Sequence, residues 1–154
     1  MEWAVLTHVL VAFGFVAGMV GRNVTIAQAR RSRDITAVTE LMAAASRFDL
    51  LVRVGSLGVL VLGLLAMFIG ELSLSEHGWL VVSLVLYVTL GALVPLVFVP
   101  RGKVFDAAMA GARQHGEVTH ELTTAFRDPV VSVARNAEMV AVVVIIALMI
   151  LKPF

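Results

Sequence analysis

Four long stretches of mostly apolar residues constrain this chain more than any other feature. They cover residues 3–21, 51–69, 79–99 and 129–151. A helix rises about 1.5 Å per residue, so about 20 residues cross the ~30 Å hydrocarbon core of a bilayer. The pattern therefore predicts an all-α integral membrane protein, with four transmembrane helices packed as an antiparallel bundle.

The composition agrees with a membrane protein of one domain, residues 1–154. The chain is 60% hydrophobic and 15% charged, whereas soluble domains are about half apolar and about a quarter charged. Its net charge of +1 gives no indication of a nucleic-acid partner. The chain has no cysteine, which excludes disulfides, thiolate metal sites and cysteine nucleophiles.

The loop charges predict the orientation of the chain. Segments 22–53 and 101–127 hold ten of the 12 basic residues, and the short connection 70–78 holds none. Loops rich in arginine and lysine stay on the cytoplasmic side. We therefore expect both long loops in the cytoplasm and both termini outside.

Both long loops carry helical patterns of apolar residues. In the first loop the apolar positions recur at steps of three and four: Ile35, Val38, Met42, Ala45 and Phe48. This periodicity predicts an amphipathic helix that either lies along the membrane or continues the second span into the cytoplasm. In the second loop two short helices are expected, broken at Gly116.

Aspartate followed by proline is a favourable helix start, because the first residue caps and the second fits the first helical position. Asp128 and Pro129 have this arrangement, so we expect the fourth helix to begin there.

Glycines at helical spacing indicate where the helices approach one another. They are Gly14 and Gly18 in the first span, and Gly55, Gly58 and Gly63 in the second. Small residues at such positions let membrane helices pack closely. We expect these five glycines to hold the bundle together, and we expect the protein to form a homo-oligomer or to join a membrane complex.

Two charges lie near the start of the fourth span. Arg135 and Glu138 are three residues apart, within pairing distance on a helix. A charge in hydrocarbon is costly, so such residues pair, reach for the interface or line a polar interior. Two interpretations remain open: an interfacial ion pair that anchors the helix, and a buried polar site facing the other helices.

His8 is the only histidine well inside a span, and His77 precedes the third span. A neutral His8 bonded to a neighbouring helix is one interpretation. The other is a ligand role, since helix bundles hold haem between histidines of facing helices. If the first and third helices are adjacent, His8 and His77 are candidate axial ligands of a b-type haem.

The run HGEVTHE, residues 115–121, carries two histidines and two glutamates. Its histidines are five residues apart rather than four, so the run is not the zinc motif HExxH. No metal site is predicted. The sequence also contains no glycine-rich phosphate loop and no nucleophile elbow, so we assign no catalytic residues.

Several short features together resemble a known group. They are Trp3 and His8 in the first span, the segment GWLVVSLVLY, and the terminal LKPF. The chain resembles a domain-of-unknown-function family of four-span bacterial integral membrane proteins. That family is distantly similar to HemJ-type protoporphyrinogen oxidases and to the copper-resistance CopD domain. The resemblance implies a bacterial inner membrane location, with His8, Glu138 and the terminal Lys-Pro-Phe in HemJ-like positions.

Three functions remain open at this stage. The first is a structural or accessory membrane protein, the second a haem-associated oxidoreductase resembling HemJ. The third is a small transporter or channel, in which Arg135 and Glu138 face a hydrated interior. The first is favoured because no polar constellation in the sequence is complete.

Overall fold

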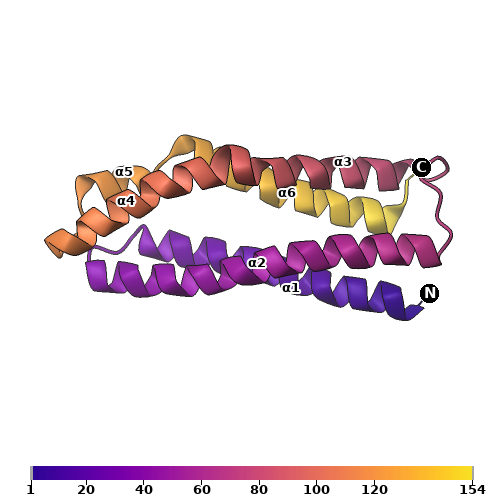
Figure 1. The fold of residues 1–154 in the computed structure, drawn as a ribbon, viewed down its shortest axis with the longest axis horizontal. Coiled ribbons are helices and arrows are strands. Elements are labelled where there is room, and N and C mark those ends of the chain that lie inside the picture. The colour runs from indigo at the N-terminus through magenta and orange to yellow at the C-terminus, as the bar shows by residue number, and fades with distance from the viewer. Residues whose placement is uncertain (1, 154) are drawn as a thin grey trace. The chain divides into compact units, whose positions relative to one another are not determined.

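The computed structural model describes residues 2–153, which contain helices and no strands. The elements in chain order are α1 (Glu2–Ala29), α2 (Ile35–Ile69), α3 (Gly78–Leu93), the π-helical segment η1 (Val94–Phe98), α4 (Val99–His115), α5 (His120–Phe126) and α6 (Pro129–Leu151) (Figure 1). The prediction of an all-α fold is confirmed.

Four helical segments are long and apolar enough to cross a membrane: residues 2–29, 35–69, 78–115 and 120–151. This confirms the four predicted spans. Each of the four segments is longer than the apolar stretch within it. The helices therefore continue beyond the apolar stretches into the segments that connect them.

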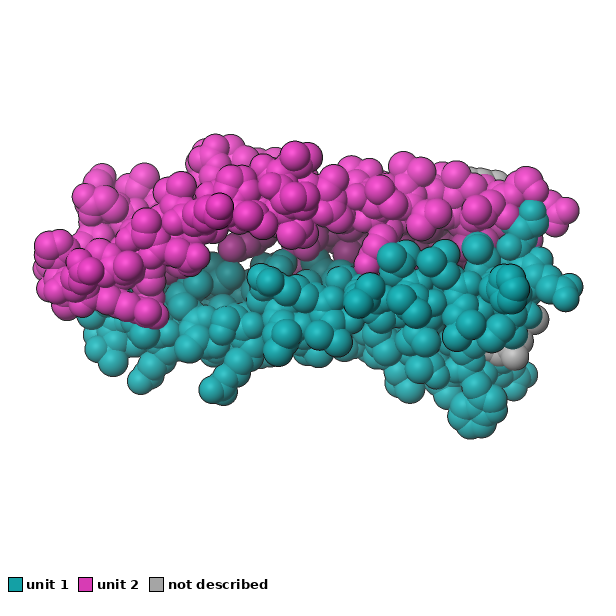
Figure 2. Space-filling model, in the orientation of Figure 1, with its two compact units in different colours: residues 1–73 teal, residues 74–154 magenta. Residues whose placement is uncertain are grey.

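The chain divides into two compact units, residues 1–73 and residues 74–154, coloured separately in Figure 2. In the first unit, α1 and α2 lie side by side as a hairpin (Figure 1). The carboxylate of Asp34 begins α2, because it accepts hydrogen bonds from the backbone N–H groups of Thr36 and Ala37. The amphipathic segment is thus the first part of α2, and it continues the second span without a break.

Glycines determine how closely the backbones of α1 and α2 approach each other. A Cβ atom added to Gly55 would lie 3.1 Å from the backbone of Phe15. One added to Gly58 would lie 2.9 Å from the side chain of Val11, and one added to Gly18 would meet α2 atoms at 3.2 Å. Larger residues at these positions would hold the two backbones apart.

Gly14 is different from the other glycines of the hairpin. Nothing lies within 4 Å of the place where its Cβ would be. The expectation of close packing within the chain therefore does not hold at Gly14. The reason is rotation: on a helix, Gly14 and Gly18 point about 40° apart, and α2 lies on the side of Gly18.

In the second unit, α3 and α6 lie side by side (Figure 1). Between α3 and α4 the chain makes the π-helical turn η1, with Pro95 at its start. Proline has no N–H to donate and its ring crowds the carbonyl four residues earlier. The wider turn accommodates that ring, and the N–H of Val99 bonds to Val94 instead of to the residue four positions back.

Helices α4 and α5 pack against each other, and we call this pair the α4–α5 head. Gly116 ends α4 in the left-handed region, with φ of 70°, as a glycine readily does. The Thr119 side chain then accepts from the N–H of Leu122 and starts α5. The rings of Phe105 and Phe126 meet edge to face at 4.9 Å, and Leu122 is fully buried. The break predicted at Gly116 is confirmed.

Asp128 joins α4 to α6. One carboxylate oxygen accepts from the backbone N–H groups of Val130 and Val131, and so caps α6. The other oxygen pairs with Arg101 at 2.9 Å. One side chain therefore sets both the start of the fourth span and the position of α4 beside it.

Candidate functional site: polar groups of the apolar helices

Three charged side chains form a cluster between α1 and α2. Asp49 accepts from the Nη1 of Arg22 at 3.2 Å and from the Nε of Arg53 at 2.8 Å. Arg22 is only 12% exposed, whereas Arg53 is 78% exposed. We call Arg22, Asp49 and Arg53 the arginine–aspartate triad. Its net charge is +1, because two guanidinium groups share one carboxylate.

The depth of the triad follows from its neighbours. The uncharged part of the first span ends at Gly21, and that of the second span begins at Val54. The triad therefore lies at the common end of the two uncharged stretches. A buried arginine at this depth needs a counter-charge, and Asp49 supplies it. The triad cannot be seen in the sequence alone, because Arg22 is 27 residues from Asp49 and only the register of the hairpin brings the two together.

His8 packs onto Gly63 across the same hairpin. A Cβ added to Gly63 would lie 3.0 Å from the Cε1 atom of the His8 ring. The backbone of Val59, one turn earlier on α2, lies near the ring. Its Nδ1 atom is buried and has no hydrogen-bond partner among the described residues. His8 thus packs against the neighbouring helix α2, and its hydrogen bond to that helix stays a prediction.

His77 belongs to the second unit. It packs edge to face against Trp79, with ring centroids 6.2 Å apart. The ammonium group of Lys152 lies 5.6 Å from the centroid of the Trp79 ring, a cation–π distance. The aromatic residue at the start of α3 thus holds the end of α6. A joint haem site of His8 and His77 stays a prediction.

Arg135 and Glu138 lie one turn apart on α6, and both are half-buried. Each takes part in a polar or electrostatic interaction. Their role as an intramembrane polar pair stays a prediction.

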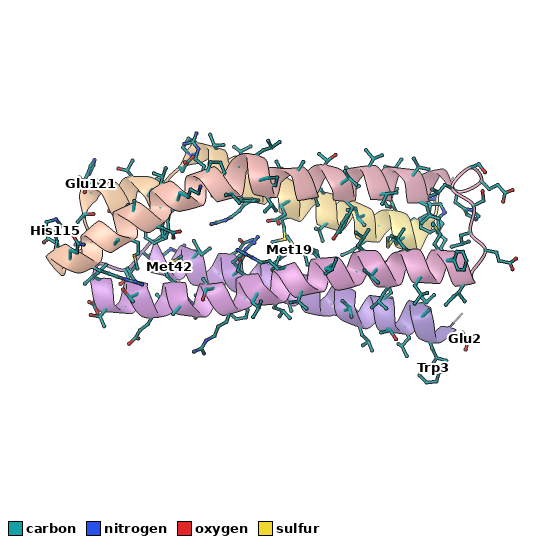
Figure 3. All side chains as sticks on the ribbon, viewed as in Figure 1. Glu2, Trp3, Met19, Met42, His115 and Glu121 are labelled. Carbon is teal, nitrogen blue, oxygen red and sulfur yellow. The ribbon has the colours of Figure 1, made fainter. Side chains whose placement is uncertain are left out.

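The histidines and glutamates of the HGEVTHE run line an open cleft of about 500 Å³ beside α4. Three small residues of α4 also line this cleft: Ala107, Ala108 and Gly111. Figure 3 shows His115 and Glu121 at this end of the second unit. Within residues 2–153, no three histidine, aspartate or glutamate side chains are placed to hold a metal ion.

One comparison with known sequences found a match over nearly the whole chain. A family described as predicted integral membrane protein (DUF2269) matches residues 3–153. This chain belongs to that family. As a DUF2269 protein it resides in the lipid bilayer, crossing it with several helices. No match to a curated protein or to a solved structure was found.

Proposed function

We propose that this DUF2269 protein is a non-catalytic, structural or accessory membrane protein that acts by helix association, first of all with a second copy of itself. The observation that carries this proposal is the face of α1 around Gly14. The space beside Gly14 is open, and the neighbouring side chains of Leu10 and Phe13 are 60% and 70% exposed. Ala17, also exposed, continues the same face one turn further on.

Positions 10, 13, 14 and 17 follow the steps of three and four that place residues on one side of a helix. A small residue between larger apolar ones provides a hollow, into which another membrane helix packs closely. In lipid this gain comes from van der Waals contact rather than from the hydrophobic effect. The α1 face therefore has the form of a helix-association surface.

Gly14→Leu fills that hollow and should abolish self-association. We expect the wild type to be dimeric or larger in lipid nanodiscs or mild detergent, and the variant to be monomeric. Native mass spectrometry and energy transfer between labelled copies measure this directly. The matched control is Gly91→Leu on α3, since Gly91 also has nothing within 4 Å of its Cβ position.

A wild type that is monomeric at all protein-to-lipid ratios would refute self-association. If Gly14→Leu instead lowers the melting temperature and leaves the oligomer unchanged, the α1 face packs within the chain. If both leucine variants dissociate the oligomer equally, the association does not depend on the α1 face in particular.

We further propose the orientation that the loop charges support, with segments 22–53 and 101–127 on the cytoplasmic side of a bacterial inner membrane. Arg22 and Arg53 of the triad are two of the basic residues on which this assignment rests.

A second candidate function is haem-associated oxidoreduction, as the likeness to HemJ-type oxidases suggested. One observation favours it: the buried Nδ1 of His8 has no partner among the described residues. His8 would supply one axial nitrogen, and His77 is the candidate for the other. A bound haem would provide the electron transfer, while the chain would hold and shield it.

The absorption spectrum of protein purified from haem-replete cells tests this candidate. A haem protein shows a Soret band and sharpened bands on reduction with dithionite, and His8→Ala should remove them. A flat visible spectrum in the wild type would eliminate the candidate. His115→Ala is the control, because that histidine is exposed on the α4–α5 head.

A further inference from the structure

Arg53 presents an oriented and largely unused hydrogen-bonding group. Its Nε donates to Asp49, and its two terminal amino groups make no hydrogen bond within residues 2–153. The side chain is 78% exposed, although this ion pair restrains it. The terminal fork of the guanidinium therefore points out of the α1–α2 hairpin, with four N–H donors available.

This fork lies at the depth of the lipid phosphates. The uncharged part of α2, Val54–Ile69, is 16 residues long. At about 1.5 Å per residue it covers ~24 Å, less than the ~30 Å hydrocarbon core. Arg53 therefore stands at the edge of the hydrocarbon, from which a long side chain extends outward to the headgroup layer.

We propose that Arg53 binds the phosphate of a membrane phospholipid, in the leaflet from which segment 22–53 emerges, and that Asp49 orients it for this contact. Guanidinium and phosphate form parallel, bidentate hydrogen bonds. Asp49 holds the stem of the guanidinium through Nε, which leaves the geometry of the outer fork intact. Because the fork is held in place, less side-chain entropy is lost on binding.

The charge of the triad favours an anionic lipid. Arg22 and Arg53 share the one carboxylate of Asp49, so the exposed guanidinium group of Arg53 is only partly neutralised. A basic residue at this depth attracts lipids that carry a net negative charge. The phosphate group is common to all phospholipids, so zwitterionic lipids should bind at the same place more weakly.

The test measures how many lipid molecules the full-length protein retains. Purified protein is titrated with phosphatidylglycerol, or with phosphatidylcholine, in mild detergent, and lipid-bound species are counted by native mass spectrometry. Arg53→Gln should weaken the tightest phosphatidylglycerol site by roughly fivefold, the effect of one basic residue at an anionic surface. With phosphatidylcholine, which has no net charge, Asp49→Asn should weaken binding, because Arg53 remains but is no longer held in place. With phosphatidylglycerol the lost carboxylate acts in the opposite direction, since its removal leaves Arg53 more positive.

Arg47→Gln is the matched control, since Arg47 is an exposed arginine of α2 outside the triad. Equal loss of lipid in the Arg47 and Arg53 variants would overturn the proposal in favour of general charge attraction. So would unchanged binding in Arg53→Gln. In a third arm, inorganic phosphate is added at a large excess over lipid: displacement of the lipid would show a general anion site, and we expect none.

Discussion

Gly55→Leu is expected to destabilise the protein more than a leucine at any other glycine of the α1–α2 hairpin. The new Cβ would lie 3.1 Å from both Cα and Cβ of Phe15. Cα is a backbone atom, so no side-chain rotation relieves the contact, and the two helices must move apart. We expect a loss of about 3 kcal/mol in the free energy of unfolding, at the upper end for overpacked interiors.

Thermal unfolding in detergent, followed by circular dichroism, measures this loss. At about 2–4 °C per kcal/mol for a chain of this size, the melting temperature should fall by ~6–12 °C. Two controls separate packing from the mere addition of leucine. Gly91→Leu adds the same atoms where the space is open and outside the association face of α1, and should change the free energy of unfolding by less than about 0.5 kcal/mol.

Gly21→Leu is the intermediate case. Its Cβ would meet the ring of Phe48, which is a side chain and can turn away. If all three leucine variants have the same melting temperature, the contact at Gly55 is not what limits the approach of α1 to α2.

Much of the fold could be predicted because its signals are local. The cap and proline at residues 128 and 129 gave the start of α6, which runs to Leu151 as expected. Gly116 gave the break between α4 and α5, since a left-handed residue there favours glycine. Helix length, capping and turn residues depend on neighbours within a few positions, so one sequence suffices to find them.

Other features could not be predicted because they depend on how helices face each other. Gly14 and Gly18 form one sequence motif, yet only Gly18 touches α2. The pairing of Arg22 with Asp49 requires the register of the hairpin, which the loop length alone does not give. The π-helical turn at Pro95 likewise follows from the hydrogen bonds around it rather than from the proline alone.

Asp49→Asn should be the most damaging conservative substitution in α2. It keeps the size of the side chain and removes the one negative charge of the triad. Arg22, only 12% exposed, would lose that counter-charge at the edge of the hydrocarbon. Removing one partner of a buried ion pair costs about 3–5 kcal/mol, and because Asp49 is itself 31% exposed we expect about 3 kcal/mol.

A double-mutant cycle decides whether this loss belongs to the pair. Arg22→Gln and Asp49→Asn are measured singly and together by thermal unfolding. If the ion pair carries the effect, the double variant should be more stable than the sum of the single losses predicts, by about 1–3 kcal/mol. Glu40→Gln, at an exposed acid of the same helix, should change the free energy of unfolding by less than about 0.5 kcal/mol. Additive losses would mean that Asp49 stabilises α2 independently of Arg22, and the contact between Arg22 and Asp49 would then carry no coupling energy.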